Sequence, residues 1–386
     1  MFEVKTMNNI AQAGLNELSS KGIMVNVEAE NPDALLIRSA KLHDIEFGDR
    51  LLAVGRAGVG TDNVPIERCT EKGIVVFNAA GANAQAVVEL AVCSLVLASR
   101  NIMDASFWAR SLAGRENIEA EVESGKKNYV GPEIMGKTLG IIGLGNIGSR
   151  IANAAIGLGM DVIGYDPYMS VESAWRISSE VRHAEDLATV YRQADYILIQ
   201  LHLNDKTRGM LGSDAFRQMK NGVRIINLAR GGLVDTDAIL AAIAAGKVAR
   251  YVTDFPDDKL IGAKGVVAFP HLGASTPESE EKCAVMAAKE LADYLIDGTT
   301  KNSVNLPDVS LDRAGAARIC VIHENVPRMI NAFLDVISAA DMNVEHMINK
   351  ARGEIAYTII DVSAPVSKEM QEKLSKVAHV RRVRIL

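Results

Sequence analysis

The chain alternates short apolar runs with longer stretches of helical periodicity, a pattern typical of parallel α/β domains. Three apolar runs near the N-terminus predict buried strands at 35–37, 51–54 and 74–77, with helices at 9–20 and 66–72. The alternation resumes after residue 138, with predicted strands at 139–142, 161–165, 196–201, 224–228, 251–253 and 266–268. We therefore predict two doubly wound parallel-sheet α/β domains in this part of the chain.

The order of elements changes after residue 276. A long helix is predicted at 277–297, and the segment 298–307 without periodicity reads as a linker. Beyond it, strands are predicted at 318–322, 354–362 and 380–386, with helices at 327–340 and 368–377. This split βαββαβ order predicts a ferredoxin-like module at the C-terminal end.

One glycine motif lies directly between a predicted strand and a predicted helix: Gly143-x-Gly145-x-x-Gly148. Gly143 permits the tight turn, Gly145 lets the backbone approach a pyrophosphate, and Gly148 lets the helix pack close to the strand. The helix N-terminus then offers N–H groups to the phosphates. Asp166 ends the next strand and can accept hydrogen bonds from both ribose hydroxyls, which favours NAD over NADP. A tight turn without a ligand is the alternative.

Composition narrows the possible partners. The 386 residues carry a net charge of −6, which argues against nucleic acid or an anionic membrane as partner. Four scattered cysteines form no CxxC pair, so we predict reduced thiols and no metal site. The most apolar stretch, 84–98, contains Glu89 and is too short to span a bilayer. With no signal-peptide pattern at the N-terminus, we expect a cytoplasmic protein.

Several strings together resemble the D-isomer-specific 2-hydroxyacid dehydrogenases. They are Ile-Arg-Ser at 37–39, the run 55–63, the glycine motif, the run 227–235 and Pro-His-Leu-Gly-Ala-Ser-Thr at 270–276. The resemblance implies a discontinuous substrate-binding domain at 1–100 and 284–305, with an NAD-binding Rossmann domain inserted at 101–283. It also implies a C-terminal ACT regulatory domain at 315–386.

Arg230 and His271 are the catalytic candidates. Arg230 follows a buried strand at the edge where open α/β sheets bind ligands, and a guanidinium there can grip a carboxylate. The resemblance makes His271 the base that removes the hydroxyl proton. It also implies a glutamate partner for the histidine, which is absent from the stretch 254–260. Asp258 is the best replacement and Asp257 the second, unless both lie in a solvated loop.

The resemblance also assigns residues to the cofactor and the substrate. Asp254 matches the position that meets the nicotinamide carboxamide. The expected cofactor-binding set is Gly143, Gly145, Asn146, Ile147, Gly148, Asp166, Ala229, Asp254 and Gly273. The expected substrate-binding set is Arg38, Arg56, Val59, Gly60 and Asn83. Its two arginines lie at carboxyl ends of strands and suit a phosphorylated substrate, although each could instead form a surface ion pair.

In the C-terminal module, His323, Asn325 and Asn343 match positions at which related ACT domains bind L-serine. Amides suit this zwitterion because they donate to its carboxylate and accept from its ammonium group. Ordinary turn-forming asparagines are the alternative. ACT domains pair with a copy in another subunit, so the resemblance implies a homo-oligomer.

The expected activity is NAD-dependent oxidation of D-3-phosphoglycerate to 3-phosphohydroxypyruvate, the first step of L-serine biosynthesis. Two alternatives stay open. One is a dehydrogenase for another substrate, such as a reductase of hydroxypyruvate or 2-oxoglutarate. The other is a non-catalytic, NAD-responsive binding protein built on the same fold.

Overall fold

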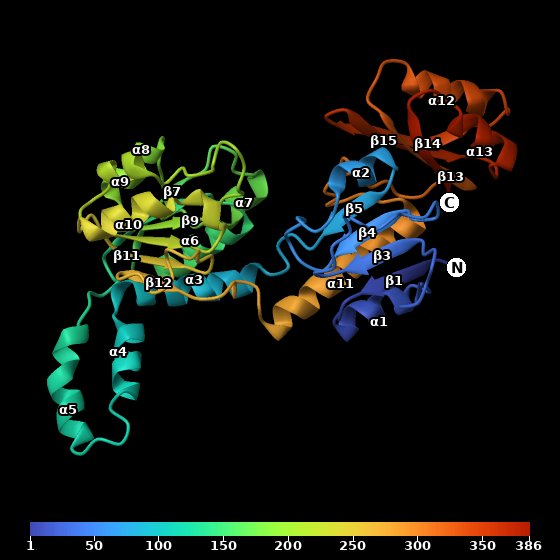
Figure 1. The fold of residues 1–386 in the computed structure, drawn as a ribbon. Coiled ribbons are helices and arrows are strands. Elements are labelled where there is room, and N and C mark those ends of the chain that lie inside the picture. Colours follow the sequence, from blue (N-terminus) through green and yellow to red (C-terminus); the bar gives the residue numbers. More distant parts are fainter. The chain divides into compact units, whose positions relative to one another are not determined.

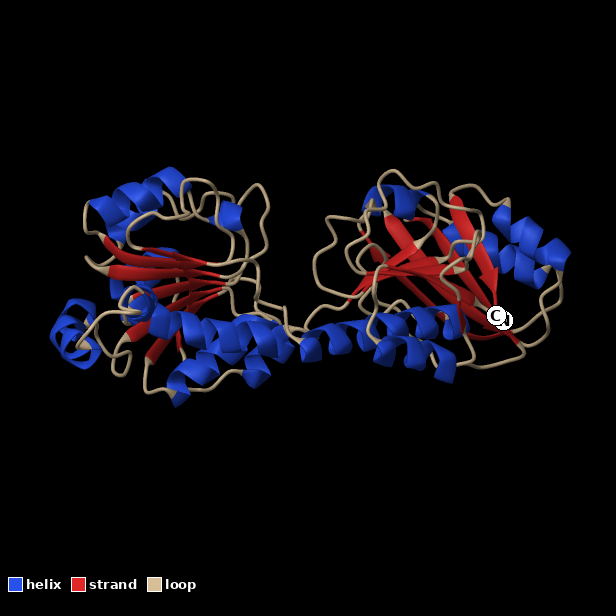
Figure 2. Ribbon diagram, turned by 60° about the horizontal axis from the view of Figure 1, so that its bottom comes forward, coloured by secondary structure: helices blue, strands red, loops and turns tan.

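The computed structural model describes residues 1–386 except the side chain of Glu172. Two compact units make up the chain. Unit 1 consists of Met1–Asn83 together with Pro277–Leu386, and unit 2 is the intervening segment Ala84–Thr276. In Figure 1, unit 1 combines the blue and the orange-to-red ends of the chain, while unit 2 is coloured from blue-green to yellow. Each unit has its own sheets with helices packed on them, as Figure 2 shows.

The N-terminal part of unit 1 is a five-stranded parallel sheet of order β2-β1-β3-β4-β5. Its strands are β1 (Glu3–Met7), β2 (Met24–Val25), β3 (Ala34–Ile37), β4 (Ala53–Arg56) and β5 (Val75–Asn78). Its helices are α1 (Gln12–Ser20), α2 (Ile66–Glu71) and α11 (Pro277–Asp297). Alternate residues of β3 pack on opposite faces, with Leu36 in one hydrophobic cluster and Leu35 and Ile37 in another. The predicted doubly wound sheet is confirmed.

Three strands of this sheet differ from the prediction, which did not include the two-residue strand β2. The strand predicted at 51–54 begins at Ala53, because Leu51 belongs to a turn in which its N–H bonds Gly48 O. Strand β1 was not predicted because only Val4 and Thr6 of its five residues are buried. A half-buried strand offers no continuous apolar run.

Unit 2 is built on a seven-stranded parallel sheet of order β12-β11-β10-β9-β6-β7-β8. The strands are β6 (Thr138–Ile142), β7 (Asp161–Tyr165), β8 (Arg182–His183), β9 (Tyr196–Ile199), β10 (Val223–Asn227), β11 (Val248–Thr253) and β12 (Val266–Ala268). The helices are α3 (Ala84–Ser99), α4 (Ile102–Arg110), α5 (Ile118–Gly125), α6 (Asn146–Gly157), α7 (Val171–Arg176), α8 (Leu187–Gln193), α9 (Ser213–Gln218) and α10 (Thr236–Ala244), with single 3-10 turns η1 (Lys126–Tyr129) and η2 (Gly231–Leu233). The chain reverses its direction of strand addition between β6 and β9, which is the switch point of a Rossmann fold.

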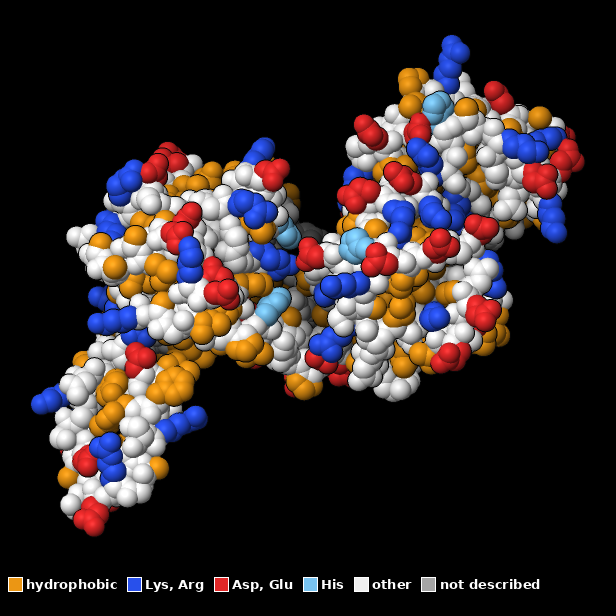
Figure 3. All heavy atoms as spheres, in the orientation of Figure 1, with side chains coloured by type: hydrophobic (Ala, Val, Ile, Leu, Met, Phe, Trp, Pro, Cys, Tyr) orange, Lys and Arg blue, Asp and Glu red, His pale blue; other side chains and the backbone are white. Residues whose placement is uncertain are grey.

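Helices α4 and α5 form an arm that extends from the body of unit 2 (Figure 1). Hydrophobic side chains lie along this arm in Figure 3. Its exposed apolar residues include Phe107, Ile118, Val122 and Val130. An arm with so much exposed apolar surface is typical of a contact with another protein surface.

The C-terminal part of unit 1 is a four-stranded antiparallel sheet of order β14-β15-β13-β16. Its elements are β13 (Ala317–Glu324), α12 (Met329–Ser338), β14 (Val344–Arg352), β15 (Ile355–Val362), α13 (Lys368–Ser375) and β16 (Val380–Ile385). This is the predicted ferredoxin-like order. One face packs on α12 and α13, whereas Ile322 and Tyr357 on the other face share a core with Leu36 and Leu295.

Buried arginines fasten this antiparallel sheet to the rest of unit 1. Arg384 donates to the backbone oxygens of Tyr294 and Leu295, 3.0 and 2.8 Å away, and Arg318 donates to Asp297 O at 2.8 Å. All three oxygens lie in the last turn of α11, where carbonyls can accept from side chains; Tyr294 O also accepts from Gly298 N at 2.9 Å. The cations also suit the negative end of the helix dipole.

Within the described part of the chain, no single helix is long and apolar enough to cross a membrane. Helices α3 and α4 would pass that test together, but a 75° bend separates them.

Candidate functional site

The glycine motif forms an open cradle at the switch point of unit 2. The backbone turns sharply at Gly143, whose φ is +97°, and an added Cβ there would lie 2.3 Å from Gln200 O. At Gly148 an added Cβ would lie only 2.0 Å from Gly143 O, so the start of α6 and the turn require glycine. Nothing lies within 4 Å of a Cβ built on Gly145, the residue before α6. This space fits a pyrophosphate at the helix N-terminus.

Helix α6 begins at Asn146, inside the glycine motif. Gly148 therefore lies in the first helical turn rather than in the loop. The first turn places the N–H groups of Asn146 and Ile147 among those that have no intrahelical acceptor. Both residues belong to the predicted cofactor-binding set.

Asp166 follows β7 and lies beside the glycine motif. Its Oδ2 accepts from Leu144 N at 2.8 Å, and its Oδ1 accepts from Tyr168 N at 2.9 Å. These two bonds hold the carboxylate at the carboxyl edge of the sheet, next to the cradle. A carboxylate oxygen has two acceptor sites, so it can still receive a ribose hydroxyl.

Arg230 lies three residues after the end of β10, and the buried Asn227 shapes this turn. Asn227 Nδ2 donates to Arg230 O at 2.9 Å, and Asn227 Oδ1 accepts from Ala229 N at 3.2 Å. The guanidinium is half-buried, and its carbon lies 5.9 Å from the centre of the Phe255 ring. Arg230 is thus held over an aromatic face at the carboxyl edge of the sheet.

The same aromatic ring also contacts His271. The ring centroids of Phe255 and His271 are 4.4 Å apart with a 46° angle between the planes. Phe255 therefore lies against both predicted catalytic side chains. Phe255 is not among the site residues predicted from the sequence, although an aromatic residue directly after Asp254 was an available signal.

Asp254 is the carboxylate with the clearest relation to His271. It directly follows β11 and is buried, and its Oδ2 accepts from Gly273 N at 3.1 Å. Burial raises the pKa of the Asp254 carboxyl above its usual value, against the opposing charge of nearby His271. Its Oδ1 is buried without a hydrogen-bond partner among the described residues. An unsatisfied buried oxygen at a ligand-binding edge fits an amide donor such as the nicotinamide carboxamide.

Asp257 and Asp258 lie farther along the loop after β11. The Asp257 carboxylate accepts from Thr236 Oγ1 at 2.5 Å and from Lys259 N and Leu260 N at 3.0 and 3.1 Å. These bonds outweigh the effect of partial burial and lower the pKa of Asp257. Its oxygens therefore stabilise the loop. Asp258 is exposed.

The predicted substrate residues of unit 1 gather at the carboxyl edge of its parallel sheet. Arg56 Nε donates to Arg38 O at 3.1 Å, so the two arginines are adjacent. The Arg56 guanidinium lies across Gly58, where a Cβ would be 2.0 Å from Nη1. Arg38 forms an ion pair with Glu280 of α11, and both side chains are about 41% exposed. The pair is open enough to solvent for an anionic ligand to compete for it.

The remaining predicted substrate residues are less well defined by contacts. Val59 and Gly60 are half-buried, and Val59 O accepts from Asn78 Nδ2 at 2.5 Å. Asn83 ends the first segment of unit 1, and its Oδ1 is buried without a partner among the described residues.

The three predicted regulatory residues do not converge within one chain. His323 is buried, and its ring nitrogens contact Glu324 O at 2.7 Å and Thr358 Oγ1 at 2.8 Å. Asn325 follows the end of β13 and donates to Gly353 O, whereas Asn343 lies at the other end of the sheet beside Ser363. A ligand that touches both asparagines therefore requires a second copy of this module.

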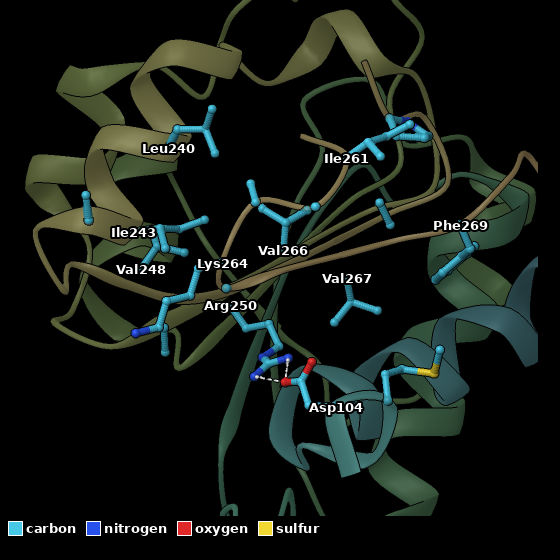
Figure 4. Close-up of a pocket in the computed structure, with 18 of the residues that line it drawn as sticks. Asp104, Leu240, Ile243, Val248, Arg250, Ile261, Lys264, Val266, Val267 and Phe269 are labelled. Atoms are coloured by element: carbon cyan, nitrogen blue, oxygen red, sulfur yellow. Dashed lines mark hydrogen bonds and ion pairs between the residues drawn. The ribbon is translucent and has the colours of Figure 1, made fainter. Parts of the chain in front are cut away.

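A pocket of about 1130 Å³ lies elsewhere in unit 2, along the β12 edge of the sheet. Figure 4 shows Leu240, Ile243 and Val266 on its walls and the ion pair of Arg250 with Asp104 at its rim. Asp104 belongs to α4, the first helix of the arm. The pocket contains none of the predicted catalytic residues. In the described part of the chain, no group of three His, Cys, Asp or Glu residues could hold a metal ion.

Comparisons with known proteins agree with this geometry. A family model for the NAD-binding domain of D-isomer-specific 2-hydroxyacid dehydrogenases matches residues 95–273. A putative D-3-phosphoglycerate dehydrogenase of Schizosaccharomyces pombe is 30% identical over 407 residues, which cover 94% of this chain and 82% of that relative. The D-3-phosphoglycerate dehydrogenase of Methanocaldococcus jannaschii is 35% identical over 295 residues. That match covers 74% of this chain but only 54% of the relative's length.

The solved structures support the fold. The NAD⁺-bound 3-phosphoglycerate dehydrogenase of Entamoeba histolytica aligns with a TM-score of 0.62 at 24% identity, covering 79% of this chain and 98% of that one. The family match confirms the prediction of an NAD-binding Rossmann domain. The chain belongs to the D-isomer-specific 2-hydroxyacid dehydrogenase family.

Proposed function

We propose that this chain catalyses the NAD-dependent oxidation of D-3-phosphoglycerate to 3-phosphohydroxypyruvate, the first step of L-serine biosynthesis. The observation that carries the proposal is the cluster at the carboxyl edge of unit 2. There, Phe255 contacts both Arg230 and His271, and Asp254 lies beneath the loop that carries His271. A cation for a carboxylate and a base for a hydroxyl proton are the two groups that oxidation of a 2-hydroxy acid requires.

In the proposed mechanism, Arg230 binds the carboxylate of the substrate and polarises the oxygen at C2. His271 accepts the hydroxyl proton as the C2–H bond breaks and its electron pair leaves with the hydrogen. The bound NAD supplies the acceptor for that hydride. The role proposed for Asp254, which accepts a hydrogen bond from the loop that carries His271, is to stabilise the positive charge that the ring gains.

Arg38 and Arg56 favour a phosphorylated substrate over an unphosphorylated one. Two arginines at the carboxyl edge of one sheet, with Arg56 bonded to the backbone of Arg38, suit a dianionic phosphate better than a hydroxyl. The D-3-phosphoglycerate dehydrogenases among the relatives support the same choice. The role proposed for both arginines is therefore to bind the phosphate, with Val59, Gly60 and Asn83 as neighbouring substrate contacts.

The test is NADH formation at 340 nm with D-3-phosphoglycerate, D-glycerate and D-2-hydroxyglutarate, each in parallel with NADP⁺. We expect turnover with D-3-phosphoglycerate and NAD⁺. Turnover with only an unphosphorylated acid would assign the chain to another 2-hydroxy acid. Tight NAD⁺ binding without turnover of any acid would favour a non-catalytic binding protein.

We further propose that the C-terminal module, residues 315–386, is an ACT domain that binds L-serine between two copies. The opposite positions of Asn325 and Asn343 on the sheet support a two-copy site. Two features support a homo-oligomer. One is the arm with its exposed apolar side chains, and the other is the pocket along the β12 edge, which residues of α4 help to line. We place this enzyme in the cytoplasm, in accord with its biosynthetic role.

A further inference from the structure

Arg176 lies beside the cofactor cradle but is not one of the predicted cofactor-binding residues. It is the last residue of α7, and its Nη1 donates to Asn146 Oδ1 at 3.0 Å. Asn146 is the first residue of α6 and directly follows Gly145, over which the backbone is open. The hydrogen bond therefore holds an exposed guanidinium at the mouth of the predicted pyrophosphate site.

Asn153, a second residue of α6, holds the backbone of Arg176 in place. Asn153 Nδ2 donates to Arg176 O at 2.7 Å, and Asn153 Oδ1 accepts from Ser178 N at 2.8 Å. At the other end of α7, Ser170 caps the helix by accepting from Ser173 N. The two bonds of Asn153 tie the end of α7 to the helix that begins at the glycine motif.

The glycine motif itself supplies too little positive charge to balance a bound pyrophosphate. The motif 143–148 contains no lysine or arginine, and Asp166 beside it is acidic. The pyrophosphate of a dinucleotide carries two negative charges, whereas a helix N-terminus supplies only about half a positive charge. A guanidinium can bind phosphate oxygens in a bidentate manner, and Asn146 is a neutral, exchangeable partner for it.

We propose that Arg176 is a cofactor-binding residue that exchanges its bond to Asn146 for the pyrophosphate of an ADP-containing dinucleotide. This inference rests on the NAD binding of the proposed function, but it does not depend on the substrate or on turnover. It predicts that the contribution of Arg176 is confined to ligands with phosphate groups.

The test is calorimetric titration of the full chain with ADP-ribose, which contains the pyrophosphate, and with adenosine, which does not. Arg176→Ala should weaken ADP-ribose binding about 5- to 10-fold, in the range of one exposed charge-assisted bond. Adenosine affinity should change less than about twofold, and the loss should shrink in high salt. Arg176→Lys should recover part of the affinity because it retains the charge.

Arg192→Ala is the matched control. Arg192 is also exposed and also donates to a neutral side-chain oxygen, that of Thr189, but it lies near the end of α8, before β9. This variant should bind both ligands like the unmodified chain. Equal losses for ADP-ribose and adenosine in Arg176→Ala, or no loss for either, would overturn the proposal. An unmodified chain that does not bind ADP-ribose would overturn it as well, whereas lack of turnover with D-3-phosphoglycerate would not affect it.

Discussion

Charged side chains are held in opposite ways in the C-terminal antiparallel sheet and at the carboxyl edge of the parallel sheet in unit 2. In the former, Arg318 and Asp361 are fully buried and form two parallel hydrogen bonds of 2.7 and 2.8 Å. In the latter, Arg230 is half-buried, His271 is exposed and Asp254 is buried with one unsatisfied oxygen. The buried ion pair of the antiparallel sheet has no group free to bind a ligand. The edge of the parallel sheet has several groups that can bind one.

The difference teaches how to separate structural from functional charge in this fold. A buried ion pair with all its bonds made is costly to break, because the remaining partner is left charged in an apolar core. An open or half-satisfied group at a sheet edge contributes little to folding but is available to bind. Substitutions in the two regions should therefore change different measurements.

The largest effect is expected for Arg318→Met, which leaves Asp361 unpaired in the core. We expect a loss of about 3–5 kcal/mol in the free energy of unfolding of unit 1, measured by urea titration with circular dichroism. Both tryptophans, Trp108 and Trp175, lie in unit 2, so tryptophan fluorescence should report a separate and unchanged transition. The double variant Arg318→Met/Asp361→Leu should recover much of the loss. A single variant as stable as the unmodified chain would contradict a structural role for the pair.

His271→Ala should change turnover and leave the stability of the fold unchanged. Turnover of D-3-phosphoglycerate should fall about 10²-fold or more, because general-base catalysis is removed. The unfolding transition and NADH affinity should stay unchanged, since the side chain is exposed. His346→Ala, an exposed histidine of β14, serves as the control and should retain full turnover. Normal turnover of His271→Ala would remove its assignment as the base.

Glu290 combines features of both regions, because it is buried but only partly hydrogen-bonded. One carboxylate oxygen accepts from Asn302 Nδ2 at 3.0 Å, and the other has no partner among the described residues. Burial raises the pKa of its carboxyl from 4.5 to about 7. The fold therefore favours the protonated form, and this contribution to stability is complete below about pH 4.5. It falls as the pH rises towards 7, by about 3 kcal/mol at 1.36 kcal/mol per pKa unit.

Glu290→Gln should remove this part of the pH dependence and make unit 1 more stable above pH 7. Urea titrations between pH 5 and pH 8 measure the slope. Glu281→Gln, an exposed residue of the same helix α11, should leave the slope unchanged. An identical slope in Glu290→Gln and the unmodified chain would show that this carboxyl is not the titrating group.

The smallest effect is expected for Asp166→Ala at the cradle. Loss of the ribose acceptor should weaken NADH binding about tenfold, which is about 1.4 kcal/mol. The discrimination against NADPH should also decrease, because a negative charge is removed. Asp161→Ala changes the first residue of the same strand β7 and should leave both affinities as they were. A variant that loses NADH affinity but still rejects NADPH would separate the two roles.

The sequence predicted what depends on neighbours along the chain. The strand, glycine turn and helix around 138–157 and the long helix α11 follow from local periodicity and from glycines that no other residue can replace. The positions of Arg230 and His271 at strand ends were predictable for the same reason. The roles of these residues stay predictions.

What could not be predicted depends on contacts between distant segments. Arg38 pairs with Glu280, which is 242 positions away, and no local pattern announces that bond. The hydrogen bonds between Arg384 and the end of α11 could not be predicted either. They are made to backbone carbonyls, which every residue has, so they require no particular residue type in the helix. The stacking of Phe255 on His271 also depends on where two loops meet.

The shared core of unit 1 has a consequence for the order in which the chain can fold as it is synthesised. Strands β1 to β5 leave the ribosome first, but the helix α11 and the sheet face that cover them are encoded after residue 276. All of unit 2 is synthesised before α11, so it can fold before unit 1 is complete. The first strands must therefore wait, with apolar faces exposed, through the synthesis of an entire unit, which makes them the segment that most needs a chaperone.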